Sequence, residues 1–189
     1  MSPDSKRADA SRNASRLLAA ARALVAESGN EVALDEVARR AGVGNATLYR
    51  HFPTRADLLA AVYADEVATL CGRASSLCAS LPPTEALFAW LEEFVVHVAT
   101  KRPLAQAATA GPGDRRTPLF DEWHAAITAA ATTLVSGAEL RPGVTTADVL
   151  ALTTGAALAT AGPDEARRLV GLLRSGLSPA GPNRSGAAS

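Results

Sequence analysis

The sequence of 189 residues predicts an all-α fold. Apolar residues recur at helical spacing in nearly every segment, and no stretch shows the alternation of a half-buried strand. Hydrophobic residues make up 48% of the chain but aromatic residues only 4%, and this alanine-rich composition favours closely packed helices over sheets. Glycine, proline and Thr-x-x-Asp motifs mark where one helix ends and the next begins.

The N-terminal segment is expected to hold a short arm and one helix. Residues 1–10 are polar and are predicted to be disordered. The helix that follows places Leu17, Ala21 and Leu24 on one face. Gly29 then ends it, as glycine often does at a helix C-terminus.

A glycine-marked break separates the next two helical patterns. The first is expected from about Leu34 to Ala41, and the second from about Asn45 to His51, before Pro53. Gly42 lies between them and can adopt a positive φ without steric cost. A helix, a glycine-containing turn and a short second helix form the helix-turn-helix arrangement, whose second helix enters the major groove of DNA.

The short second helix has two chemically different faces. Leu48 and Phe52 lie four residues apart and are expected to point together into the core. The other positions carry small, hydroxyl, amide and cationic side chains, the types that contact phosphates and base edges. The candidate DNA-contacting residues are Asn45, Ala46, Thr47, Tyr49, Arg50, His51 and, at the start of the next helix, Arg55. A packing role for Tyr49 and a structural role for His51 are the alternatives.

Further helices are expected along the rest of the chain. Thr54-x-x-Asp57 and Thr145-x-x-Asp148 resemble capping boxes, and Pro163 suits a first helical turn. The expected segments are a long helix from residue 54 to about 80, a helix over 84–101, a short segment over 103–110, a loop at 111–118, and helices over 119–137, 145–161 and 163–177.

Residues 67–177 contain five of the eight aromatic residues and two of the three histidines of the chain. They form either a core in an alanine-rich bundle or the wall of a ligand pocket with a histidine as its polar group. The candidate pocket residues are Trp90, Phe94, His97, Phe120, Trp123 and His124. Cys71 and Cys78 are interpreted as small buried hydrophobic residues, and no metal-ligand pattern or cofactor motif is found.

The segment LDEVARRAGVGNATLYRHFPTRADLLAAV, residues 34–62, closely resembles the DNA-binding signature of the tetracycline-repressor (TetR) family, and the likeness extends over about residues 12–66. This resemblance implies a dimeric, all-helical transcription regulator, most often a repressor that a small molecule releases from a palindromic operator. It assigns Asn45, Ala46, Thr47 and Tyr49 to the groove and His51 and Arg55 to the DNA backbone. Ala33 and Gly44 replace common capping residues, and Asn45 replaces a frequent lysine.

These observations together predict a domain order and a set of partners. The domains expected are a disordered arm (1–10), a TetR-type helix-turn-helix domain (11–66), an effector-binding and dimerisation domain (67–177) and a disordered tail (178–189). The expected partners are a double-stranded DNA operator, a small apolar or amphipathic effector, and a second copy of the chain that pairs through the last two helices.

Two other classes of protein, an enzyme and an interaction module, are the alternatives to a regulator. The sequence contains none of the common hydrolase, phosphate-loop, dinucleotide or zinc-protease motifs, which argues against an enzyme. An interaction module that has lost DNA binding is disfavoured by the intact Thr47, Tyr49 and His51. Because no signal peptide or membrane-spanning run occurs, a cytoplasmic protein without membrane contact is expected.

Overall fold

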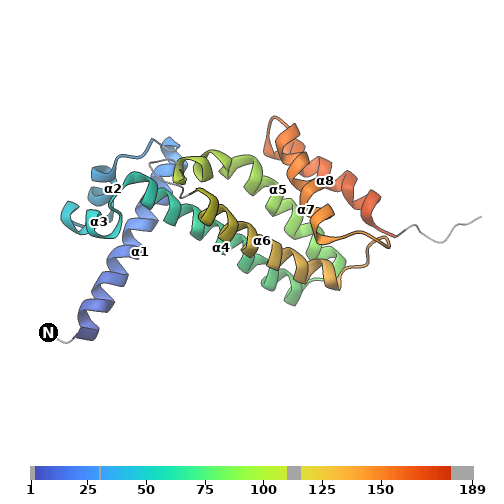
Figure 1. Cartoon of the computed structure of the whole chain (residues 1–189), viewed down its shortest axis with the longest axis horizontal. Helices are drawn as coiled ribbons and strands as arrows, with labels where there is room; N and C mark the ends of the chain where they lie inside the picture. The colour runs from blue at the N-terminus through green and yellow to red at the C-terminus, as the bar shows by residue number, and fades with distance from the viewer. Residues whose placement is uncertain (1–2, 30, 110–115, 180–189) are drawn as a thin grey trace, which may run out of the picture. The chain divides into compact units, whose positions relative to one another are not determined.

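The computed structural model describes residues 3–29, 31–109 and 116–179. Eight α-helices occupy this part of the chain, and no strand occurs within it, so the all-α prediction is confirmed. The helices are α1 (Pro3–Ser28), α2 (Leu34–Ala41), α3 (Asn45–His51), α4 (Arg55–Ser80), α5 (Pro83–Ala108), α6 (Arg116–Gly137), α7 (Thr146–Ala159) and α8 (Pro163–Leu177) (Figure 1). Across the described ranges, no helix combines the length and apolar character needed to span a membrane.

The chain divides into two compact units. Unit 1 comprises Met1–Val67 and Lys101–Trp123, and unit 2 comprises Ala68–Thr100 and His124–Ser189. The first boundary falls beside the predicted domain boundary at residue 66, but residues 101–123 group with the N-terminal helices rather than with the C-terminal domain. Periodicity locates a helix but does not reveal which neighbours each half of it contacts.

Two segments differ from the sequence-based expectation. Residues 3–10 form the first turns of α1 instead of a disordered arm, and Pro3 suits the first helical position there. Pro103 does not interrupt α5, although an internal proline costs a helix about 3 kcal/mol. The buried side chains of Leu104, Ala105 and Ala108 follow this proline, and their packing offsets the lost backbone hydrogen bond.

The predicted loop and tail lie largely outside the described residues. The predicted loop at 111–118 lies mostly outside the described residues, and α6 begins at Arg116. The predicted disordered tail, apart from Ser178 and Pro179, also lies outside them.

Capping distinguishes two groups of helices. At α4, the Thr54 hydroxyl accepts a hydrogen bond from the Asp57 backbone (3.1 Å), and the Asp57 carboxylate accepts one from the Thr54 backbone (3.0 Å). Thr145 and Asp148 form the same capping box at α7. Ala33 and Gly44, which precede α2 and α3, provide no side-chain cap. The two helices of the helix-turn-helix therefore depend more on tertiary packing than on local caps.

Candidate nucleic-acid interface

The turn between α2 and α3 is built around Gly42. This residue has φ 62° and ψ 39°, a left-handed conformation that glycine adopts readily. Its carbonyl accepts a hydrogen bond from Arg16 of α1 at 3.3 Å. A Cβ atom at this position would lie 2.7 Å from Arg16 Nη2, so the contact with α1 also favours glycine. The first helix thus braces the turn that positions α3.

The inward face of α3 is as the sequence predicts. Leu48 is fully buried and Phe52 is 8% exposed, so the residues at i and i+4 attach the helix to the core. The α3 backbone begins with hydrogen bonds from Thr47 (2.9 Å) and Leu48 (3.1 Å) to the Gly44 carbonyl. Because the helix has only seven residues, this anchoring determines its orientation.

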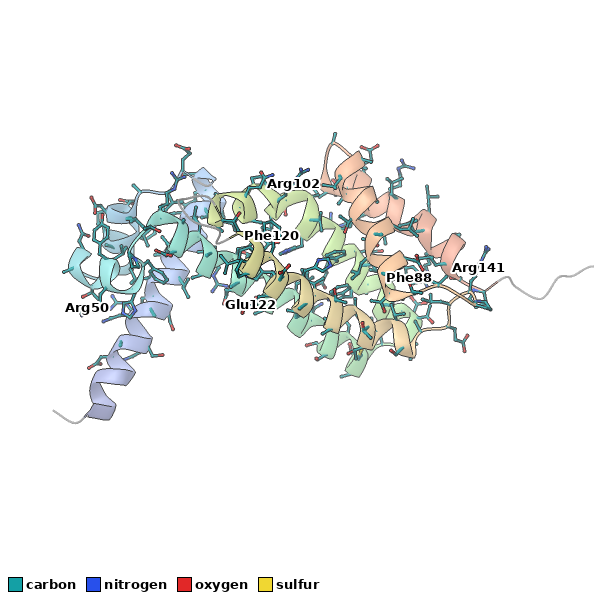
Figure 2. All side chains as sticks on the ribbon, in the orientation of Figure 1. Arg50, Phe88, Arg102, Phe120, Glu122 and Arg141 are labelled. Carbon is teal, nitrogen blue, oxygen red and sulfur yellow. The ribbon has the colours of Figure 1, made fainter. Side chains whose placement is uncertain are left out.

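The outward face of α3 presents polar groups that have no partner among the described residues. Tyr49 is 47% exposed, Arg50 is also exposed, and Thr47 is half-buried. Within the described ranges, none of these three side chains has a hydrogen-bond or ion-pair partner. Figure 2 labels Arg50 on α3 at the outer edge of the group formed by α1, α2 and α3. A hydroxyl, a phenol and a guanidinium that are available for new hydrogen bonds suit phosphates and base edges.

Two of the remaining candidates, Asn45 and Arg55, already have partners within the chain. Asn45 Nδ2 donates to Asp35 Oδ1 at 3.0 Å, and Arg55 lies 4.0 Å from Glu31. The His51 ring is half-buried and lies 6.2 Å from the Phe52 ring, centroid to centroid. Ala46 is exposed and leaves room for close approach. All seven candidates therefore lie on α3 or at the start of α4, but they differ in how free their polar groups are.

The two arginines of α2 are neutralised by neighbours. Arg39 donates to both carboxylate oxygens of Glu36, at 2.7 and 2.6 Å, and Arg40 donates to Glu27 at 2.6 Å. These hydrogen bonds lower the pKa of Glu36 and of Glu27 below their usual values. Through these exposed pairs, Arg39 and Arg40 form part of a solvated charged face of α2.

The predicted effector-pocket residues are divided between the two compact units. In unit 2, Trp90 is fully buried, its indole N–H donates to the Leu70 carbonyl at 2.9 Å, and its ring stacks on Phe94 at 5.3 Å. Trp90 is therefore a packed core residue. His97 is also buried, at 7% exposure, whereas His124 is exposed. Sequence periodicity placed these residues on helices but did not determine which way each side chain points.

Phe120 and Trp123 belong to unit 1, where they join Tyr63. The Trp123 ring lies 4.5 Å from the Tyr63 ring and 5.8 Å from the Phe120 ring, both edge to face. Phe120 remains 37% exposed at one side of this cluster (labelled in Figure 2). Burial, with a smaller contribution from Glu66, raises the pKa of Tyr63 to about 12. The cluster offers an aromatic surface that is not completely covered.

Unit 2 also has two surface hollows that the sequence did not indicate. One, of about 400 Å³, borders the Arg73–Glu93 ion pair, and the other, of about 540 Å³, borders Arg141 and Leu152. None of the six predicted pocket residues lines either hollow.

The cysteines and acidic residues give no further site. Cys71 is half-buried, and Cys78 is exposed, so the prediction of two buried cysteines is wrong for Cys78. Among the described residues, no group of three His, Cys, Asp or Glu side chains could hold a metal ion.

Apolar side chains remain exposed along α7 and α8, which lie side by side (Figure 1). Leu152 is 46%, Leu158 52% and Leu172 60% exposed. On α7, the exposed positions follow one helical face at spacings of four and seven residues. We call this set the apolar stripe: Ala151, Leu152, Gly155, Leu158 and Ala159 of α7 and Leu172 of α8. The opposite side of α8 is attached to α5, where Arg174 pairs with Glu85 and lies 5.2 Å from the Phe88 ring.

Sequence reasoning missed two residues that support the helix-turn-helix. Arg16 contacts Gly42 from 26 positions earlier, and Asp35 contacts Asn45 from ten positions earlier. No local spacing rule relates such pairs. A glycine at the turn and an arginine on the preceding helix are compatible with many other pairings.

Comparisons with known proteins agree with this architecture. The family model described as bacterial regulatory proteins of the tetR family matches residues 17–62, and the model described as the transcriptional regulator SbtR-like C-terminal domain matches residues 82–179. No curated protein matches the chain.

Two solved structures are similar to this chain over most of its length. A TetR transcriptional regulator from Streptomyces coelicolor is 38% identical, covers 88% of this chain and 99% of its own, and has a TM-score of 0.71. A TetR regulator from Mycobacterium vanbaalenii is 34% identical over 92% of this chain and 99% of its own, with the same TM-score of 0.71.

A more distant structure shares the fold alone. The regulator FadR from Bacillus subtilis, solved in complex with stearoyl-CoA, is 15% identical, covers 85% of this chain and 97% of its own, and has a TM-score of 0.60. One family model matches the N-terminal part, including the helix-turn-helix, and the other matches the C-terminal part, while the two relatives above 30% identity cover 88% and 92% of the chain. The chain therefore belongs to the TetR family of DNA-binding transcriptional regulators, which are not enzymes.

Proposed function

We propose that this regulator acts as a homodimeric repressor that binds a pseudo-palindromic operator and is released by a small apolar or amphipathic effector. The observation that carries the proposal is the outward face of α3, where Thr47, Tyr49 and Arg50 present polar groups without partners among the described residues. In a repressor, these groups would contact the major groove, and His51 and Arg55 would contact phosphates. On binding DNA, Arg55 would leave its 4.0 Å ion pair with Glu31 and contact a phosphate instead.

The apolar stripe supports the dimer. Three exposed leucines on adjoining helices are costly in water, because each buried leucine side chain contributes about 1.5–3 kcal/mol. Gly155 and Ala159 lie on the same face and would allow a partner helix to come close. Two copies of α7 and α8 would bury the stripe in a four-helix arrangement with two-fold symmetry. Such a dimer would present two copies of α3 to two half-sites about 34 Å apart or somewhat more.

An apolar effector is supported by the aromatic cluster of Tyr63, Phe120 and Trp123. Phe120 is partly exposed beside a buried tryptophan, so a flat or aliphatic ligand could extend the edge-to-face packing. Because Trp90 is fully buried, the proposal is based on Phe120 and Trp123 among the predicted pocket residues. FadR, which shares this fold, was solved in complex with stearoyl-CoA, an amphipathic molecule. The effector would need to bind the DNA-free conformation more tightly by about 1–3 kcal/mol to weaken operator binding about 5–150-fold.

The central experiment selects an operator from random double-stranded DNA and measures the binding of alanine variants to it. Thr47→Ala and Tyr49→Ala should weaken operator binding while leaving the unfolding midpoint close to that of the wild type. Arg39→Ala is the matched control, because Arg39 is exposed on α2 and already paired with Glu36. The assignment of α3 to the major groove fails if Thr47→Ala and Tyr49→Ala bind like the wild type.

Light scattering tests the dimer separately. Leu172→Glu should convert the protein to a monomer at micromolar concentration, because a charge would be buried in the interface. Leu81→Glu is the control, since Leu81 is also an exposed leucine, at 39%, but lies outside the stripe. A wild-type monomer, or equal effects of the two substitutions, would contradict dimerisation through α7 and α8.

The effector is tested by tryptophan fluorescence. Small aliphatic and aromatic acids and their amphipathic esters should change the emission of Trp123 and, at the same concentrations, weaken DNA binding. Phe120→Ala should reduce both effects. A compound that changes the emission but leaves DNA affinity unaltered would argue against coupling between the two sites.

A further inference from the structure

One hydrogen bond connects the first turns of the two helix-turn-helix helices. Asn45, the first residue of α3, donates from Nδ2 to Oδ1 of Asp35, the second residue of α2, at 3.0 Å. An ionised carboxylate accepts hydrogen bonds and cannot donate them. The amide nitrogen of Asn45, and not its oxygen, must therefore face Asp35, so chemistry determines the orientation of the carboxamide.

The consequence is the polarity that Asn45 presents to its surroundings. With Nδ2 turned toward Asp35, the carbonyl oxygen Oδ1 is turned away, and it has no hydrogen-bond partner among the described residues. The Asn45 side chain is exposed, and Tyr49, which is also exposed, follows it by four residues on the same side of α3. Asp35 thus holds Asn45 with a hydrogen-bond acceptor directed outward.

An outward acceptor discriminates between bases in the major groove. Adenine N6 and cytosine N4 are hydrogen-bond donors there, whereas guanine O6 and thymine O4 are acceptors that an amide oxygen would repel. A freely rotating carboxamide could instead turn its N–H groups toward guanine or thymine. The fixed orientation therefore restricts the bases that Asn45 tolerates.

We propose that Asp35 is a positioning residue for sequence specificity: it holds Asn45 as an acceptor, so that each half-site requires adenine or cytosine at the base facing Asn45. This inference rests on the proposed contact between α3 and the major groove. Asp35 itself need not touch DNA, because it acts through the orientation of Asn45.

The test uses the full-length protein and its selected operator, with all four bases placed in turn at every position of a half-site. Asn45→Ala identifies the position that Asn45 reads, since the preference there is lost. The wild type should favour adenine or cytosine at that position by about 3–10-fold over guanine or thymine, the range expected for one hydrogen bond. Asp35→Asn should reduce this preference about threefold or more, because an amide can face Asn45 with either its oxygen or its nitrogen.

Glu36→Gln is the matched control. It removes the same charge from the next residue and leaves Arg39 without a charged partner there, whereas the hydrogen bond of Asn45 is to Asp35. It should strengthen binding to all sequences alike and leave the base preference unchanged, whereas Asp35→Asn should alter the preference at one position only. Circular dichroism should show that both variants remain folded.

The outcomes separate this inference from the proposed function. If Asp35→Asn keeps the wild-type preference, or changes all positions equally as Glu36→Gln does, Asp35 has no positioning role. If Asn45→Ala loses no base preference while Thr47→Ala still weakens operator binding, the inference is overturned and the α3 interface stands. If the wild-type protein selects no operator, both are overturned.

Discussion

Replacing Gly42 with alanine should destabilise the protein more than replacing Gly29 with alanine. Both glycines have positive φ, 62° and 71° respectively. A left-handed conformation destabilises the folded state of an alanine variant by about 1–2 kcal/mol. Alanine also lowers the entropy of the unfolded chain, which stabilises the folded state by about 0.4–1 kcal/mol. Backbone strain by itself thus predicts a loss of about 1 kcal/mol in the free energy of unfolding at either position.

The difference between the two glycines comes from Arg16. A Cβ atom at Gly42 would lie 2.7 Å from Arg16 Nη2, whereas a Cβ atom at Gly29 would meet nothing within 4 Å. The arginine end is flexible and would move away, but it would lose its hydrogen bond to the Gly42 carbonyl. That exposed bond contributes about 0.5–1 kcal/mol, so Gly42→Ala should cost about 1.5–2 kcal/mol in total.

Urea unfolding monitored by circular dichroism measures both variants. With a denaturant slope of about 1–3 kcal/mol/M, the unfolding midpoint should fall further for Gly42→Ala than for Gly29→Ala by about 0.2–1 M. In an Arg16→Met background the guanidinium is absent, so Gly42→Ala should cost no more than Gly29→Ala. The reasoning is refuted if the two alanine variants have the same midpoint in the wild-type background. It is also refuted if the excess loss persists without the Arg16 guanidinium.

Three further predictions concern caps and titrating groups. Ala33→Ser should raise the free energy of unfolding by about 0.5–1 kcal/mol, because Ala33 is an extended N-cap with Glu36 three residues later, whereas Thr54→Ala should lower it by about 1 kcal/mol. Urea midpoints should move in opposite directions for these two variants. The Thr145 hydrogen bonds lower the pKa of Asp148, so the capping box of α7 stabilises the fold above the usual aspartate pKa and is lost as the pH falls through the lowered value. In Asp148→Asn, the urea midpoint should therefore fall less on acidification than it does in the wild type. The same fall in both proteins would contradict the role of this cap. Burial raises the pKa of Tyr63 to about 12, so an ultraviolet titration of the folded protein should contain a tyrosine component near that pH that Tyr63→Phe removes. Because an unfolded tyrosine ionises near pH 10, that ionisation should favour unfolding as the pH rises above about 10.

Local chemistry was sufficient to predict the helix-turn-helix and the caps. Leu48 and Phe52 lie four residues apart and share a face in any α-helix, so their burial follows from spacing. Gly42 occupies a left-handed turn that few other residues enter, and the two Thr-x-x-Asp motifs form capping boxes within one helical turn. Each of these features depends on residues within four positions of one another, which a single sequence displays directly.

Tertiary structure decided the features that depend on distant residues. Burial of the residues after Pro103 allows α5 to continue where the sequence predicted a break. The hydrogen bonds of Arg16 and Asp35 join residues ten or more positions apart, and tertiary contacts assign Trp90 to one compact unit and Phe120 and Trp123 to the other. Periodicity specifies which side of a helix is apolar, but the partner that covers that side is chosen by the summed packing energy of the whole chain. The sequence thus determined the polar surface of α3 by itself, while the orientation of Asn45 on that surface was decided by a neighbouring helix.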